Sequence, residues 1–143
     1  MKFKAKCPAS IGELIQGKIR GQEMLVSCPI YNFVEVEICM NNGIEIEKEK
    51  IYKAFEIFLE LYEIKEIRAK DLKVTTHSSI PRGKGMAGST ADISAGLAAL
   101  SSLLSLPISQ EDIASIAVRV EPTDSTVFSM LALYDHLEGK HRE

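Results

Sequence analysis

Apolar and polar residues alternate over much of the first forty residues, a pattern typical of β-strands. Proline, glycine and polar residues divide this region into runs that predict four short strands, at 3–9, 13–19, 24–30 and 32–40. In the last run Val34, Val36 and Ile38 fall on one face, which we expect to lie against the core. The Asn-Asn-Gly sequence at 41–43 predicts a turn after it.

Beyond residue 50 the apolar spacing changes to the i, i+3, i+4 period of an amphipathic helix. The residues that carry this period are Ile51, Ala54, Phe55, Phe58, Leu59 and Tyr62. A strand is predicted at 71–78, followed by a glycine-rich loop and an apolar helix that Pro107 ends. Small residues on that helix predict close packing by a neighbour; they are Ala91, Ala95, Gly96, Ala98 and Ala99.

Two further helices are predicted after Pro107. Ser109 and Asp112 resemble a capping box at the start of the first. A break at 121–126 follows, and Thr123 or Asp124 can cap a fourth helix. Its apolar residues would be Val127, Met130, Leu131 and Tyr134. Strands that precede most of the helices predict the α+β class, in one domain spanning 1–143.

Composition narrows the classes of function. The chain has 143 residues, 45% hydrophobic and 26% charged, which is ordinary for a soluble globular domain. The formal net charge of -3 argues against a nucleic-acid partner but leaves small anionic ligands open. The three cysteines lack Cys-x-x-Cys spacing, so neither a disulfide framework nor a zinc site is expected. We see no signal peptide or membrane span and expect a cytoplasmic protein with no membrane partner.

The glycine-rich loop before the second helix carries the first candidate chemistry. Gly83, Gly85 and Gly88 allow successive backbone N–H groups to face one concavity, and the helix N-terminus adds partial positive charge. Both features suit a phosphate. Ser89 and Thr90 lie in the first helical turn, where a hydroxyl can reach a phosphate-bound magnesium ion. The alternative is a tight turn with a helix cap, and the spacing is not that of a Walker A loop.

Carboxylates supply the second candidate chemistry. Glu121 and Asp124 lie in the break between two helices, where they can hold Mg²⁺ or orient a hydroxyl nucleophile. Alternatively, Asp124 caps the next helix and Glu121 is solvated. Glu13 is either an exposed strand residue or a site carboxylate. Arg82 and Lys84 flank the glycines and either approach phosphate or lie in a solvated loop tip.

These segments, in this order, resemble the GHMP kinases, which are named for galacto-, homoserine, mevalonate and phosphomevalonate kinases. The segment IPRGKGMAGSTA at 80–91 is similar to the family's second motif, Pro-x-x-x-Gly-Leu-Gly-Ser-Ser-Ala. The matching residues are Pro81, Gly85, Ser89 and Ala91, whereas Met86, Ala87, Gly88 and Thr90 depart from the motif. With CPASIGELIQG, LVSCP and EPTDSTVF, the chain resembles the L-threonine kinase branch, which makes L-threonine O-3-phosphate for cobalamin and includes propanediol-utilisation kinases.

The resemblance implies a fold, a reaction and a set of site residues. The expected fold is the N-terminal ATP-binding domain of the family, with early strands followed by helices packed on the sheet, and with the C-terminal domain absent from this chain. The implied cofactors are ATP and Mg²⁺. Phosphate-binding residues would be Pro81, Gly83, Lys84, Gly85, Met86, Ala87, Gly88, Ser89 and Thr90.

The remaining roles follow from the same motifs. Ser89 and Glu121 would bind the metal, and Asp124 would be the catalytic residue facing the acceptor hydroxyl. Ser10 and Glu13 would line the pocket for the small-molecule substrate. Two alternatives stay open: another acceptor such as homoserine, or a non-catalytic nucleotide-binding module. The chain would then depend on a homodimer partner or on the missing C-terminal half.

Overall fold

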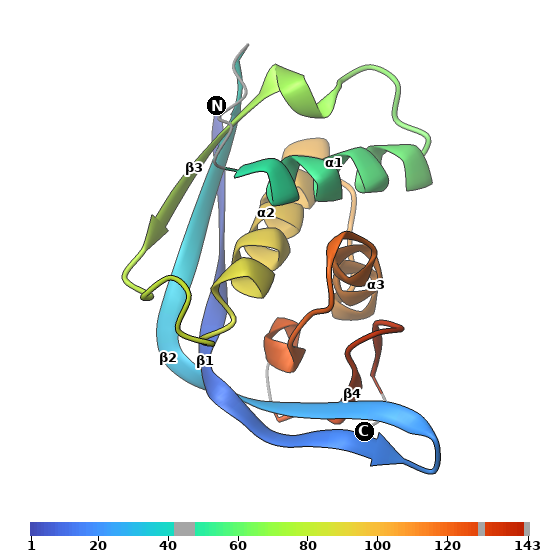
Figure 1. Ribbon diagram of the computed structural model, residues 1–143. Coiled ribbons are helices and arrows are strands. Elements are labelled where there is room, and N and C mark those ends of the chain that lie inside the picture. Colours follow the sequence, from blue (N-terminus) through green and yellow to red (C-terminus); the bar gives the residue numbers. More distant parts are fainter. Residues whose placement is uncertain (42–47, 129–130, 142–143) are drawn as a thin grey trace.

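The computed structural model describes residues 1–41, 48–128 and 131–141. Within these residues a five-stranded antiparallel sheet is covered by three α-helices (Figure 1). Helix α2 (Gly88–Leu104) packs directly against the two longest strands, and α1 (Glu49–Leu61) and α3 (Gln110–Val120) pack against α2. This arrangement confirms the α+β class. The turn expected at 41–43 falls mostly outside the described residues.

The first two strands form one long hairpin, so the expectation of four short strands was wrong. Strand β1 (Lys2–Ile19) pairs with β2 (Gln22–Met40) along its length. The pairing register shifts between Pro8 and Glu13 and again before Ile15. Such bulges bend an antiparallel ladder without ending it, which is why proline and glycine did not terminate the strands. The hairpin is visibly bent in Figure 1.

The shorter strands complete the sheet along β2. Strand β3 (Leu72–Ser78) pairs with the second half of β2. Strand β4 (Tyr134–Asp135) pairs with β2 at Leu25, and β5 (Lys140–His141) pairs with β4. As predicted, one face of β2 is buried: Val34, Val36 and Ile38 are 1%, 0% and 0% exposed.

Small side chains allow α2 to lie at the centre of the core. A Cβ atom built on Gly96 would lie 3.0 Å from Cγ2 of Ile51 and 3.3 Å from Cε1 of Phe55. The missing side chain therefore lets α1 approach α2 closely, as the small residues of this helix predicted. No helix in the described ranges is both long and apolar enough to cross a membrane.

The segment after α3 departs from expectation. Helix α3 itself begins with the predicted capping box, in which Ser109 Oγ accepts a hydrogen bond from the Asp112 amide at 3.0 Å. The prediction of a fourth helix, however, was wrong for the described residues of this segment; Met130, which was expected on that helix, lies outside them. A single 3₁₀ turn, η3 (Ser125–Val127), follows Asp124, and Tyr134 belongs to β4; a second 3₁₀ turn, η2 (Ala69–Asp71), precedes β3. Asp124 occupies the N-cap position of η3, but its side chain makes no capping hydrogen bond; its carboxylate contacts Ser27 and Thr90 instead.

Candidate active site

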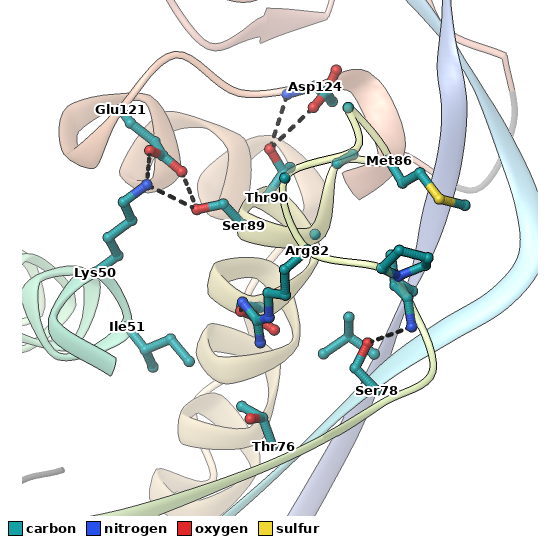
Figure 2. A pocket seen from close by; sticks show the side chains of 18 of the residues that line it. Lys50, Ile51, Thr76, Ser78, Arg82, Met86, Ser89, Thr90, Glu121 and Asp124 are labelled. Carbon is teal, nitrogen blue, oxygen red and sulfur yellow. Dashed lines mark hydrogen bonds and ion pairs between the residues drawn. The ribbon is translucent and has the colours of Figure 1, made fainter. Parts of the chain in front are cut away.

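A cavity of about 750 Å³ opens where the β3–α2 loop, the first turns of α1 and α2, and the segment after α3 meet (Figure 2). Most of the predicted site residues line it: Glu13, Pro81, Gly83, Gly85, Met86, Ala87, Gly88, Ser89, Thr90, Glu121 and Asp124. Two predicted residues, Lys84 and Ser10, do not line it. Segments far apart in sequence therefore converge at the N-terminus of α2.

The loop wall of the cavity has an unusual backbone. Gly83 and Gly85 have φ angles of 69° and 67°, and Ala87, the residue before α2, has a φ of 56°. Left-handed residues that alternate with ordinary ones turn backbone N–H groups toward a common point. The N-cap residue of α2, Ala87, makes no side-chain hydrogen bond to the first turn of the helix. The free N–H groups of that turn and the helix dipole favour an anion in the cavity.

Ser10 supports this loop from behind. Its side chain is completely buried, and its backbone amide donates to the carbonyl of Met86 at 3.0 Å. Its hydroxyl accepts a hydrogen bond from the amide of Gly12 at 2.8 Å. The contacts of Ser10 therefore tie the end of the loop to β1. Lys84 lies at the exposed tip of the loop.

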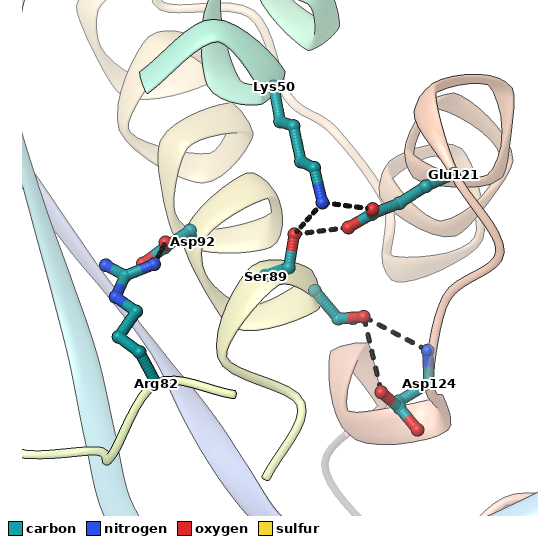
Figure 3. A network of polar contacts seen from close by, with 7 residues as sticks. Lys50, Arg82, Ser89, Asp92, Glu121 and Asp124 are labelled. Atoms are coloured by element: carbon teal, nitrogen blue, oxygen red, sulfur yellow. Dashed lines mark hydrogen bonds and ion pairs between the residues drawn. The ribbon is translucent and has the colours of Figure 1, made fainter. Parts of the chain in front are cut away.

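Three side chains, from the first turns of α1 and α2 and from the residue that follows α3, meet at the outer edge of the cavity (Figure 3). We call them the outer cluster: Lys50, Ser89 and Glu121. The hydroxyl of Ser89 donates to Oε1 of Glu121. The ammonium group of Lys50 donates to Oε2 of Glu121 at 2.5 Å and to Oγ of Ser89 at 3.3 Å. The carboxylate in this cluster is thus neutralised by a cation.

A second group of side chains lies deeper, and we call it the inner cluster: Ser27, Thr90 and Asp124. Oδ1 of Asp124 accepts a hydrogen bond from the hydroxyl of Ser27 at 3.1 Å, and Oδ2 contacts the hydroxyl of Thr90 at 3.5 Å. The backbone amide of Asp124 donates to Thr90 Oγ1 at 3.1 Å. Burial raises the pKa of Asp124, and the nearby charge of Glu13 raises it further, while the Ser27 hydrogen bond lowers it. A carboxyl group with a raised pKa is suited to accepting a proton.

An ion pair fixes the other wall of the cavity. Arg82, on the loop, donates to Oδ2 of Asp92 on α2 at 2.6 Å. Oδ1 of Asp92 is buried and has no hydrogen-bond partner among the described residues. Burial raises the pKa of Asp92, and Arg82 partly offsets this effect. Lys48 and Lys50 also line the cavity, so three cationic side chains face the space in which a polyphosphate would lie.

The donor set at the outer cluster fits a magnesium ion bound together with phosphate. Mg²⁺ prefers oxygen ligands and is usually held by one or two carboxylates plus substrate phosphates and water. Ser89 and Glu121 supply a hydroxyl and a carboxylate that already touch. No group of three or more His, Cys, Asp or Glu side chains in the described ranges could hold a metal ion alone. These residues therefore suit a metal that arrives with a nucleotide.

Sequence analysis missed three residues of this site: Lys50, Ser27 and Asp92. Lys50 did carry a signal, because a basic residue in the first helical turn opposes the helix dipole and calls for a reason. Ser27 lies within strand β2, and Asp92 lies on the largely apolar helix α2. Neither position had a motif that pointed to a partner distant in sequence.

Comparison with known proteins agrees with this geometry. The GHMP kinases N terminal domain family matches residues 49–132. The L-threonine kinase of Citrobacter freundii is 40% identical over 132 residues, which cover 92% of this chain and 46% of that protein. The L-threonine kinase of Salmonella typhimurium is 41% identical, with coverage of 92% and 44%. The chain therefore spans about half the length of these relatives.

Solved structures share the fold. The crystal structure of Methanococcus jannaschii mevalonate kinase matches 100% of this chain and 56% of its own, with a TM-score of 0.76 and 15% identity. Homoserine kinase from Cytophaga hutchinsonii matches 84% of this chain and 41% of its own, with a TM-score of 0.61 and 18% identity. At these identities the likeness concerns the fold alone. Because the family match covers more than half of the chain, including helices α1, α2 and α3, this chain belongs to the GHMP kinases.

Proposed function

We propose that this chain is the nucleotide-binding half of a kinase that transfers the γ-phosphoryl group of ATP to the hydroxyl group of L-threonine. One observation carries the proposal. Ser89 and Thr90, neighbours at the start of α2, contact Glu121 and Asp124 respectively, so a pair of metal-binding groups and a proton acceptor flank one anion-binding helix end. The two relatives with about 40% identity, both L-threonine kinases, support the choice of acceptor.

The residues of the outer cluster and the loop would bind the nucleotide. Phosphoryl transfer depends mainly on positioning and on neutralising phosphate charge, and bound Mg²⁺ would supply part of that neutralisation. Ser89 and Glu121 would be its protein ligands. The N–H groups at the start of α2 and the loop residues 81–87 would hold the phosphates, with Arg82 and Lys50 at the cavity wall.

The inner cluster would accept the proton of the threonine hydroxyl group. As the threonine hydroxyl oxygen bonds to the γ-phosphorus, the bond from this phosphorus to the β,γ-bridging oxygen breaks and ADP leaves. The hydroxyl proton passes to the carboxylate of Asp124, whose raised pKa makes it a stronger base than an ordinary aspartate. Ser27 and Thr90 hold the carboxylate in place through their hydroxyl groups.

The acceptor pocket would lie next to Asp124. Glu13 lines the cavity, and its charge raises the pKa of Asp124, so the two carboxylates are close in space. A carboxylate at this position can pair with the ammonium group of an amino acid. The relatives are about twice as long as this chain, and we propose that a C-terminal half, or a second copy of the chain, completes the pocket.

ADP release by the full chain, measured with and without candidate acceptors, tests the proposal. We expect release that depends on L-threonine and falls by about 10²-fold or more in Asp124→Asn. Release with L-homoserine but not with L-threonine would change the acceptor and leave the kinase reaction in place. ATP binding without release under any condition would contradict a catalytic role for this chain alone and would favour a nucleotide-binding module that needs its other half.

A further inference from the structure

Lys50 occupies an unfavourable place in its own helix. It lies in the first turn of α1, where the partial positive charge of the helix N-terminus repels an ammonium group. No hydrogen bond from a side chain caps this helix end within the described residues. Glu49, in the same turn, offsets part of this repulsion. The ammonium group of Lys50 itself is paired with groups of α2 and of the residue that follows α3 (Figure 3).

The atoms that pair with Lys50 are the atoms that would bind the metal. Its ammonium nitrogen lies 2.5 Å from Oε2 of Glu121 and 3.3 Å from Oγ of Ser89. Those two residues are the hydroxyl and carboxylate donors of the outer cluster. A metal ion bound to both of them would therefore compete with the ammonium group for the same oxygen atoms.

The other cations of the cavity have different partners. Arg82 is held by Asp92, and Lys48 donates to the hydroxyl of Thr76 at 2.7 Å. Neither Asp92 nor Thr76 belongs to the outer cluster. The Lys50 side chain is also 57% exposed, so little packing holds it where it is. It can leave Glu121 while its helix stays in place.

We propose that Lys50 is a positioning residue that takes the place of the metal in the free protein and moves to the phosphates when the nucleotide binds. In the free protein its charge holds Ser89 and Glu121 together and weakens the binding of a metal alone. A polyphosphate in the cavity attracts the ammonium group and frees both oxygen ligands. Metal and nucleotide then favour each other's binding, as two ligands coupled through one mobile group must. This inference rests on the proposed function.

The test compares two lysines of α1 in the full chain. Lys50→Met removes the charge but keeps the length of the side chain. Lys53→Met is the matched control, because Lys53 is exposed on the same helix and lies outside the cavity lining. The binding of Mn²⁺ alone is measured from the electron paramagnetic resonance signal of the unbound ion. ATP with a chelator present is titrated by calorimetry.

The affinities for Mn²⁺ and for metal-free ATP should change in opposite directions. We expect Lys50→Met to tighten Mn²⁺ binding about tenfold, because the competing charge is gone, and to weaken metal-free ATP binding about tenfold. Lys53→Met should change both affinities by less than about twofold relative to the wild type. Lys50→Arg keeps the charge and should leave Mn²⁺ binding weak. In Glu121→Gln, adding Lys50→Met should no longer tighten Mn²⁺ binding.

Different failures have different meanings. If the wild type binds ATP and Mn²⁺ together but Lys50→Met changes neither affinity, Lys50 is an ordinary surface ion pair and the kinase proposal stands. If Lys50→Met weakens Mn²⁺ binding, the lysine supports the metal site rather than competing with it, and the inference is wrong. If the wild type binds neither ATP nor Mn²⁺, the proposed function fails and this inference fails with it.

Discussion

Ser89 and Thr90 are adjacent in sequence, yet the carboxylates that they contact lie in opposite electrostatic settings. Glu121, in the outer cluster, is paired with the ammonium group of Lys50 at the cavity edge. Asp124, in the inner cluster, has hydroxyl groups as partners, and in the described part of the chain no ammonium or guanidinium group is recorded in contact with it. Burial raises its pKa.

This difference separates two chemical tasks at one helix end. A carboxylate that already holds a cation in an accessible position is suited to exchanging that cation for a metal ion. A half-buried carboxylate without a cationic partner is less stable in its ionised form and gains more from accepting a proton. Such uncompensated charge is unfavourable for folding and is a frequent feature of functional sites.

The largest effect should come from removing the proton acceptor. Asp124→Asn keeps the shape of the side chain and a hydrogen-bond acceptor for Ser27 but cannot take up the hydroxyl proton. We expect the rate of phosphoryl transfer to fall by about 10²- to 10⁴-fold, while ATP affinity changes less than about twofold. Single-turnover kinetics and ATP titration of the complete enzyme measure the two quantities. A turnover rate near that of the wild type would exclude Asp124 as the base.

The outer carboxylate should show the opposite profile. Glu121→Gln removes a metal ligand and should weaken Mg·ATP binding by about 10-fold, with metal-free ATP bound as in the wild type or slightly more tightly, because Lys50 is released. Calorimetry with and without Mg²⁺ measures both affinities. Equal weakening under the two conditions would mean that Glu121 acts on the nucleotide or on the loop, and the contrast between the clusters would disappear.

The elements of the fold were more predictable from the sequence than their lengths. Helices α1, α2 and α3 were predicted because each has apolar residues at helical spacing; α2 also has a clear stop at Pro107 and α3 a clear start in the Ser109 capping box. The long strands were divided wrongly because a bulge and a strand end use the same residues, proline and glycine. The prediction of a fourth helix was wrong because Tyr134 pairs with Leu25 of β2, a partner distant in sequence that local patterns do not reveal.

The residues of the candidate site likewise fall into some that the sequence predicts and some that it does not. The glycine loop, Glu121 and Asp124 were predicted from motifs, because their chemistry depends on short-range spacing. Lys50 and Ser27 were missed because they reach the site through tertiary packing. The packing of α1 against α2 places Lys50 at the site, and the β1–β2 hairpin places Ser27 there. The left-handed conformation of Ala87 was missed as well, since an alanine gives no sign of it.

The two carboxylates should also differ in their effect on stability. At pH 7, Asp124→Asn removes a half-buried charge that has no cationic partner and should raise the free energy of unfolding by about 1 kcal/mol. Glu121→Gln breaks a partly exposed ion pair and should lower it by less than about 1 kcal/mol. Urea denaturation at pH 7 measures both changes. If both variants are stabilised, or neither is, the two carboxylates do not differ in their electrostatic settings as described.

The stability gain in Asp124→Asn should depend on pH in a known direction. Because the pKa of Asp124 is raised in the folded state, the folded protein binds a proton more tightly than the unfolded chain does. The wild type therefore recovers stability as the pH falls through that raised pKa toward the ordinary aspartate value of about 3.9. The gain in the free energy of unfolding from Asp124→Asn should be complete at pH values above the raised pKa and absent at pH values below the ordinary aspartate pKa. Denaturation curves of both proteins from pH 7 to 4 test the sign, and a gain that does not change with pH would point to packing.

The smallest expected effect concerns Ala87, the residue that precedes helix α2. Its φ of 56° lies in the left-handed region, which costs a residue with a Cβ atom about 1 kcal/mol relative to glycine. Ala87→Gly relieves this strain but makes the unfolded chain more flexible, so the free energy of unfolding should rise by only about 0.5 kcal/mol. Ala98→Gly, in the interior of α2, is the matched control and should lower it by about 1 kcal/mol. Because the sign must differ between the two sites, equal destabilisation in urea would show that Ala87 does not adopt this conformation in solution and that the anion-binding shape of the loop is formed in another way.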